Sequence, residues 1–277
     1  MTKLTISLAQ LRIQLARADD NLATATDMIA QAAANGADIV LLPELWSTGY
    51  DLENAQQHAS NLGEGIFAQV ADAARENHIA VYGSLLERRG EQVMNCATLY
   101  DAAGKLCGVY RKIHLFRLFD EHLWLSEGET PALLQAGWGA AGLAICYDLR
   151  FPELFRRYAV AHGAALMLLC AEWPLARVAH WRTLLQARAI ENQCFVAATN
   201  SCGETGGTVF AGHSIIIDPW GQVITEASED ECLLTADIDL GEVERVRRAI
   251  PVFEDRRPDA YLGATLLTGG SRIRAES

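Results

Sequence analysis

Hydrophobic positions in this chain gather into short apolar runs, which alternate with longer segments of mixed polarity. Apolar runs of strand length are typical of buried strands, whereas apolar residues spaced three or four apart are typical of helices. Residues 38–42, with Ile-Val-Leu-Leu at their centre, lack polar alternation and predict a strand in a sheet covered on both faces. The other predicted strands are residues 4–11, 79–86, 94–100, 106–110 with a continuation to 115, 142–145, 164–170, 194–199, 208–217, 222–225 and 232–238.

Helices are predicted between these strands. The first begins at a capping Asp19 or Asp20 and ends at Asn35, where Gly36 stops it. Another opens at Pro152, because proline is favoured in the first turn of a helix. The helix that opens at Pro152 is predicted to run to residue 162, and further helices are predicted over 65–77, 176–193 and 240–250. A polar, aromatic-rich loop is predicted over 116–130, and an irregular tail from about 253.

The order of these elements predicts the fold class. Strands first alternate with helices and later follow one another in hairpins, which predicts an α/β fold with two mixed sheets between helix layers. No linker, repeat or shift in composition interrupts the 277 residues, so we predict a single domain over residues 1–277. A chain of this length can bury most of its apolar surface without disulfides.

Composition and charge argue against several classes of partner. The net charge of −12 disfavours binding to nucleic acid or to an anionic membrane surface. No apolar run approaches the length of a membrane span, and no secretory signal is recognisable, so we expect no membrane partner. The seven cysteines are an odd number scattered through apolar segments, which favours a reducing compartment and a cytoplasmic location.

Motifs for metals and nucleotide cofactors are missing from the sequence. There is no C-x-x-C pair and no H-E-x-x-H helix motif, which are common sources of metal ligands. There is also no G-x-G-x-x-G or G-x-x-x-x-G-K-[ST] loop to cradle a phosphate. We therefore expect neither a metal ion nor a cofactor.

Three ionisable side chains lie where an apolar strand meets a loop: Glu44, Lys112 and Cys146. Such strand ends are where α/β sheets carry their sites, and a thiol between a strand and a helix is a common position for a nucleophile. Each residue also has an ordinary interpretation, as a buried cysteine or as a solvated carboxylate or ammonium. Together, however, the three groups form a complete apparatus for acyl transfer.

The chemistry expected of this trio follows from their charges. The Lys112 ammonium favours the thiolate of Cys146, and Glu44 can take the thiol proton as a general base. The Lys112 ammonium and the backbone N–H of Tyr147 can stabilise the negative charge that develops on an attacked carbonyl oxygen. Glu44 then returns its proton to the leaving amine, so the expected products are ammonia and a thioester that water hydrolyses.

Three blocks around these residues resemble the Glu, Lys and Cys blocks of the nitrilase, or carbon–nitrogen hydrolase, superfamily. They are Pro43-Glu44, residues 111–116 (Arg-Lys-Ile-His-Leu-Phe) and residues 146–153 (Cys-Tyr-Asp-Leu-Arg-Phe-Pro-Glu). The resemblance covers nearly the full chain. It implies an α-β-β-α sandwich, a thioester mechanism, homodimers or larger homo-oligomers, and a second, supporting glutamate, which we assign to Glu121 rather than to another acidic residue nearby.

The residues after Cys146 resemble the amidase-type branches, because this chain has Cys-Tyr-Asp where nitrile-cleaving members usually have Cys-Trp-Glu. Residues 116–122, 187–193 and the motif around Trp173 are similar to those of ω-amidases, which hydrolyse the terminal amide of 2-oxoglutaramate or 2-oxosuccinamate. Glu172 departs from the asparagine that the resemblance leads us to expect before Trp173. Deaminated-glutathione amidases, N-carbamoyl amino acid hydrolases, nitrilases and a non-catalytic scaffold remain alternatives.

A substrate that carries its own carboxylate needs a cation in the pocket, and the arginine fork suits a carboxylate. The candidates are Arg150 and Arg177. Arg150 can instead be a structural partner of Asp148 or Glu153, and Arg177 can be a solvated residue in a first helical turn. Both interpretations stay open for each arginine.

Three further residues have a candidate role near the pocket. Trp173 follows a strand end and can form a pocket wall or simply pack, and Tyr50 can line the same entrance. His114 lies two residues after Lys112, so strand periodicity places it on the same face. A Cys–His pair would be a rival design, but we favour a supporting or core role for His114.

Overall fold

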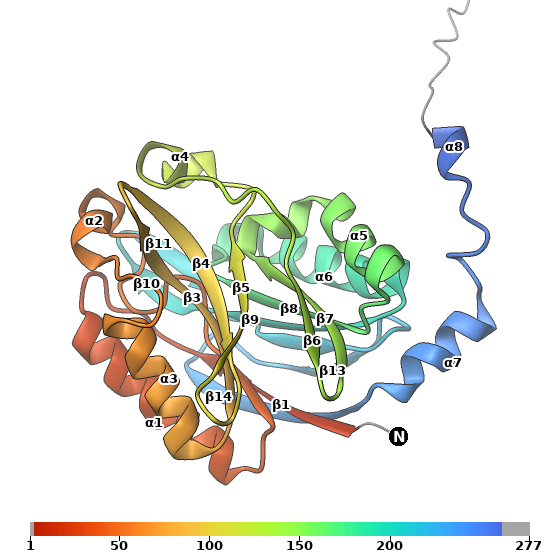
Figure 1. The fold of residues 1–277 in the computed structure, drawn as a ribbon, viewed down its shortest axis with the longest axis horizontal. Coiled ribbons are helices and arrows are strands. Elements are labelled where there is room, and N and C mark those ends of the chain that lie inside the picture. Colours follow the sequence, from red (N-terminus) through yellow and green to blue (C-terminus); the bar gives the residue numbers. More distant parts are fainter. Residues whose placement is uncertain (1–2, 262–277) are drawn as a thin grey trace, which may run out of the picture.

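Two six-stranded sheets pack face to face in the computed structural model, which describes residues 3–261 (Figure 1). The first has the order β14-β1-β2-β3-β4-β5, with β1 (Lys3–Gln10), β2 (Ile39–Leu41), β3 (Ala80–Arg89), β4 (Gln92–Tyr100), β5 (Leu106–Arg111) and β14 (Cys232–Asp239). The second has the order β13-β12-β9-β8-β7-β6, with β6 (Leu133–Ala136), β7 (Gly139–Ile145), β8 (Leu166–Ala171), β9 (Phe195–Asn200), β12 (Ile215–Ile217) and β13 (Val223–Glu226). A separate hairpin joins β10 (Cys202–Thr205) to β11 (Thr208–Ala211).

Helices cover the outer face of each sheet. The first sheet packs against α1 (Ala18–Ala34) and α3 (Gly65–Asn77), and the second against α5 (Pro152–His162) and α6 (Val178–Asn192) (Figure 1). The strand neighbours β1-β2-β3 and β7-β8-β9 run parallel, and the other pairs run antiparallel. The remaining helices are α2 (Ala55–His58), α4 (Glu121–Trp124), α7 (Gly241–Ala249) and α8 (Pro258–Tyr261), with 3-10 turns at Leu52–Asn54, Arg117–Phe119, Cys146–Arg150 and Leu175–Arg177.

Alternating side chains of one strand serve two different cores, as the period of two along a strand requires. Ile39 and Leu41 of β2 pack between the two sheets, whereas Val40 and Leu42 pack beneath α1 and α3. All four side chains are almost fully buried. The prediction of a doubly covered sheet and of an α-β-β-α sandwich is therefore confirmed.

Several predicted boundaries are wrong. The strand predicted over 208–217 is two strands, because Gly212 and His213 both take left-handed backbone angles, which end the extended run. The strand predicted to continue to 115 ends at Arg111. Strands β6 and β10 and helix α2 were not predicted, since runs of four residues carry little periodicity. The loop predicted over 116–130 contains α4, the tail from 253 contains α8, and residues 262–277 of that tail lie outside the described residues.

Parallel pairing of β7 with β8 is the feature that builds the site. Ile145 at the end of β7 lies opposite Cys170 near the end of β8. The residues that follow these two strands, Cys146 and Glu172, therefore emerge side by side at one edge of the second sheet. None of the helices between residues 3 and 261 is both long and apolar enough to cross a membrane.

Candidate active site

Cys146 lies on a strained turn between β7 and α5. Its φ angle is +42°, in the left-handed region that residues with a Cβ rarely adopt. A 3-10 turn from Cys146 to Arg150 follows directly, and Pro152 then opens α5 as predicted. Strain of this kind persists only where the surroundings hold the backbone in place, and it gathers at functional sites.

The carboxylate of Asp148 holds this turn. Its Oδ2 accepts hydrogen bonds from the backbone N–H of Ile145 at 2.9 Å and from the Tyr110 hydroxyl at 2.8 Å. Its Oδ1 contacts Nδ1 of His114 at 2.7 Å, and the His114 ring stacks on Phe151 with centroids 3.6 Å apart. His114 therefore supports the turn through Asp148, and the supporting role is the one the geometry favours.

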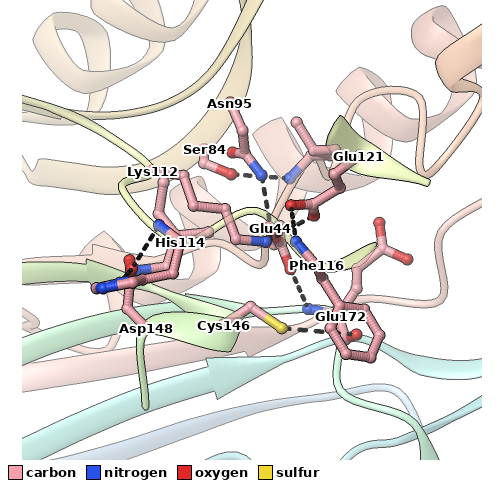
Figure 2. Close-up of polar contacts among 12 residues, drawn as sticks. Glu44, Ser84, Asn95, Lys112, His114, Phe116, Glu121, Cys146, Asp148 and Glu172 are labelled. Atoms are coloured by element: carbon pink, nitrogen blue, oxygen red, sulfur yellow. Dashed lines mark hydrogen bonds and ion pairs between the residues drawn. The ribbon is translucent and has the colours of Figure 1, made fainter. Parts of the chain in front are cut away.

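Lys112 lies directly after β5, and its ammonium bridges two carboxylates. Nζ donates to Glu44 Oε1 at 2.7 Å and to Glu121 Oε1 at 2.6 Å, and all three side chains are completely buried (Figure 2). Asn95 donates to the same oxygen of Glu44 at 2.8 Å, and the Tyr50 hydroxyl donates to Glu121 at 2.7 Å. The candidates Glu44, Lys112 and Glu121 thus form one network, and Tyr50 contacts it directly.

Burial and charge act in opposite directions on the Lys112 ammonium. Burial by itself lowers the pKa of Lys112, but the carboxylates of Glu121 and Glu44 outweigh it and hold the pKa well above its usual value. Burial raises the pKa of Glu121, although the Lys112 ammonium opposes the rise. Lys112 is therefore a permanent cation, already paired before any substrate arrives.

Lys112 favours the thiolate of Cys146, as expected, but burial and the Glu44 carboxylate oppose it. Burial raises the pKa of the Cys146 thiol well above its usual value, and the Glu44 carboxylate raises it further. Lys112 lowers that pKa, but by less than these two effects raise it. The sulfur consequently keeps its proton until a reaction removes it, next to a carboxylate that can accept it.

Glu172 connects the sulfur to the carboxylate network, and sequence reasoning did not name it as a site residue. Its backbone N–H donates to Glu44 Oε2 at 3.1 Å, and its carbonyl oxygen lies 3.9 Å from the Cys146 sulfur, which donates to it (Figure 2). The departure from asparagine before Trp173 was the one signal that could have found it. Together these contacts bring Glu44, Lys112, Cys146 and Glu121 into one cluster.

Two cavities lie beside Glu172. A narrow one of about 10 Å³ is lined by Cys146, whereas a wider one of about 260 Å³ is lined by Tyr50 and not by Cys146. Both are lined by Glu172. The narrow cavity is lined by Phe116, Cys146, Tyr147, Arg150, Glu172, Trp173, Pro174 and Arg177, and the wider one by Leu15, Tyr50, Phe119, Asp120, Glu172, Thr205, Gly206, Thr208 and Phe210.

Both candidate arginines line the narrow cavity. The Arg150 guanidinium lies over the Trp173 ring, 4.9 Å from its centroid, and contacts Nδ1 of His180 at 3.3 Å. It makes no hydrogen bond or ion pair with the Asp148 or Glu153 carboxylate, and its guanidinium instead contacts Trp173 and His180.

Arg177 and Trp173 complete the wall on this side. The Arg177 guanidinium lies 5.6 Å from the centroid of the Phe116 ring. The backbone carbonyl oxygen of Arg177 accepts a hydrogen bond of 2.9 Å from Nε1 of Trp173. Trp173 is buried, so it both packs and lines the cavity. Tyr147 is the second residue of the 3-10 turn, where a backbone N–H has no partner within the turn and can point at a ligand.

Comparisons with known proteins show the family of this chain. The family model described as carbon–nitrogen hydrolase matches residues 5–248. A 2-oxoglutaramate amidase from Bacillus subtilis is 44% identical over 94% of this chain and 100% of its own length, and the human omega-amidase NIT2 is 33% identical over 94% and 98%. The crystal structure of a CN-hydrolase superfamily protein from Xanthomonas campestris, with an arsenic adduct in its active site, superimposes with a TM-score of 0.87 at 32% identity, covering 97% of this chain and 100% of that one. The chain belongs to the carbon–nitrogen hydrolase family.

Proposed function

We propose that this protein hydrolyses the terminal amide of a short ω-amide to a carboxylic acid and ammonia, with 2-oxoglutaramate or 2-oxosuccinamate as the type of substrate. The observation that carries the proposal is the buried Lys112 ammonium shared by two carboxylates beside a strained cysteine. The relatives named 2-oxoglutaramate amidase and omega-amidase, aligned over nearly the full chain, support this branch.

In the first half of the reaction, Cys146 attacks the amide carbon while Glu44 takes the thiol proton. Because burial and the Glu44 carboxylate raise the pKa of the thiol, the proton must be transferred to Glu44 in the course of the reaction. The Lys112 ammonium and the Tyr147 N–H stabilise the oxyanion, and each donor in such a site contributes about 3–4 kcal/mol. Glu44 then protonates the leaving nitrogen, ammonia departs, and a thioester remains on Cys146.

In the second half, water replaces ammonia. Glu44 takes a proton from the water, whose oxygen attacks the thioester carbon through a second oxyanion held by the same donors. Collapse of this intermediate breaks the carbon–sulfur bond, the thiol of Cys146 regains its proton, and the acid leaves. Glu121 acts on the reaction through Lys112, because it holds the ammonium in place from the side opposite Glu44.

Arg150 and Arg177 are the cations that suit a substrate carboxylate, since both line the cavity that Cys146 also lines. Replacing either by glutamine should raise KM for carboxylate-bearing amides more than it lowers kcat. Trp173 and Tyr50 shape the two sides of the entrance. No metal or cofactor takes part in this mechanism.

Ammonia release from a panel of ω-amides, simple amides, nitriles and N-carbamoyl acids tests the proposed function. The highest kcat/KM should fall on 2-oxo ω-amides, and Cys146→Ala should abolish turnover while keeping the unfolding midpoint. A preference for nitriles or N-carbamoyl acids would move the protein to another branch. Turnover that survives in Cys146→Ala would contradict the mechanism.

We also propose a cytoplasmic homo-oligomer. All seven cysteines are free in the structure, which agrees with a reducing compartment. Light scattering on the purified protein, coupled to gel filtration, measures the mass of the assembly directly. A mass equal to that of the single 30.2 kDa chain would contradict the oligomer.

A further inference from the structure

Glu172 carries a buried carboxyl group that the mechanism above does not use. Only 1% of the residue is exposed, and its backbone is already engaged with Glu44 on one side and Cys146 on the other. Neither carboxyl oxygen has a hydrogen-bond partner among the described residues. In Figure 2 no dashed line reaches this carboxyl group, whereas the Glu44 and Glu121 carboxylates are both bonded.

The surroundings oppose a negative charge on Glu172. Burial, and then the Glu44 carboxylate, raise its pKa well above the usual value, and Glu121 adds to the rise. Lys112 opposes this, but its ammonium already donates to both other carboxylates. The neutral acid therefore presents one O–H donor for which the described chain supplies no acceptor.

The position of this donor points to a ligand. Glu172 lines both cavities and is the residue they share, which places it between the surroundings of Cys146 and the wider cavity. An unsatisfied buried polar group is costly, and natural proteins keep one mainly where a function requires it. Because Arg150 and Arg177 face the same narrow cavity, an anionic substrate is favoured there, and only a neutral Glu172 admits one without repulsion.

We infer that Glu172 is a specificity-determining residue, whose carboxylic acid donates a hydrogen bond to an oxygen of the substrate chain beyond the scissile amide. The inference rests on the proposed amidase function and names the substrate class: short amides with an oxo or carboxylate oxygen on the far side of the chain. Amides with only hydrocarbon there leave the donor unpaired and bind more weakly. An amide that carries an ammonium gains no affinity from an ion pair, because the neutral acid of Glu172 offers it no negative charge.

Binding without turnover tests this inference separately from the function. In the Cys146→Ala background, calorimetry measures Kd for 2-oxoglutaramate, for glutaramate, which lacks the oxo group, and for pentanamide, which lacks both the oxo group and the carboxylate. Glu172→Met removes the donor at similar length, and Glu172→Gln keeps a neutral donor as the matched control. Unfolding midpoints of all variants establish that each is folded.

The expected result is a loss of affinity only for ligands that carry an oxo or carboxylate oxygen beyond the amide. Glu172→Met should raise Kd for 2-oxoglutaramate about 10- to 100-fold and change Kd for pentanamide by less than about threefold. Glu172→Gln should keep both Kd values near those of the parent protein. A loss for glutaramate as well assigns the bond to the carboxylate, and a loss for 2-oxoglutaramate alone assigns it to the oxo group.

Equal changes for all three ligands, no change for any, or a Glu172→Gln loss as large as that of Glu172→Met would overturn the inference. A failure of the proposed function is a different observation: it is the absence of ammonia release by the wild-type protein, which leaves these affinities measurable.

Discussion

The backbone N–H of Glu172 donates a hydrogen bond of 3.1 Å to Oε2 of Glu44, although 128 positions separate the two residues. Glu44 follows β2 of the first sheet, and Glu172 follows β8 of the second. This bond therefore ties the candidate base to the sheet that carries the candidate nucleophile. The precision of the site depends on how the two sheets pack, as well as on the strand ends themselves.

Loss of the ammonium should destabilise the fold. Lys112→Met leaves the Glu44 and Glu121 carboxylates buried without a cation, and a broken buried ion pair costs about 3–5 kcal/mol in the free energy of unfolding. Adding Glu121→Gln should recover part of this loss, because one of the two uncompensated charges disappears. Urea unfolding of the wild type, the single variant and the double variant measures both effects. A double variant less stable than Lys112→Met would contradict the explanation.

Glu44→Gln should make Cys146 more reactive towards an alkylating reagent while it abolishes amidase activity. The Glu44 charge helps to raise the pKa of the thiol, so its removal lowers that pKa and increases the thiolate fraction near neutral pH. Peptide-resolved mass spectrometry after a short iodoacetamide pulse measures the rate. The exposed Cys107 in the same molecule is the internal control. Slower alkylation of Cys146 in the variant would show that the charge of Glu44 does not suppress the thiolate.

Asp148 should be required for the shape of the nucleophile turn. Asp148→Ala leaves the Ile145 N–H and the Tyr110 hydroxyl buried without an acceptor, which costs about 1–3 kcal/mol for each donor. We expect kcat to fall at least about tenfold with a smaller change in KM, since the reacting geometry is lost before binding is.

Asp101→Ala is the matched control for this variant, because the Asp101 carboxylate likewise accepts hydrogen bonds that shape a turn but is only partly buried and lies outside the site. It should leave kcat unchanged. Equal effects of the two aspartate substitutions on kcat would remove the special role of Asp148.

Stability should depend on pH through Glu172. Burial, and then the Glu44 charge, raise the pKa of this carboxyl in the folded protein, whereas in the unfolded chain it ionises near pH ~4.3. The folded state thus keeps a proton that the unfolded state loses, so stability present below that pH is lost as pH rises, by up to about 1.4 kcal/mol per pH unit.

Glu172→Gln removes this titration. The free energy of unfolding of the variant, measured with denaturant, should therefore rise relative to that of the wild type as the pH is raised from about 5 to about 8. A stability difference that stays constant over this range would mean that Glu172 titrates alike in both states.

Much of the site was predictable because its residues end apolar strands. Glu44, Lys112 and Cys146 stand where local patterns end, and three motifs in the expected order identify the family. The sandwich follows for the same reason, since long apolar runs require cover on both faces. Short elements such as β6 and β10 were missed because four residues do not establish a period.

What the sequence could not supply depends on contacts between distant segments. Glu172 is buried beside Cys146 only through the register of β7 with β8, in which Ile145 lies opposite Cys170. The pKa of the thiol is a balance between burial and the charges of Glu44, Lys112 and Glu121, and the extent of burial cannot be predicted from the sequence. The strand predicted over 208–217 is split partly by the positive φ angle of His213, which a histidine side chain does not predict.

A covalent thioester on Cys146 is the event on which the proposed mechanism depends. Intact-protein mass spectrometry after millisecond mixing with 2-oxoglutaramate, followed by acid quenching and peptide mapping, detects it directly. We predict a mass increase equal to the substrate minus ammonia, located on the peptide that contains Cys146 and missing from Cys146→Ala. Rapid ammonia release with no adduct on any peptide, or an adduct on another cysteine, would contradict the mechanism.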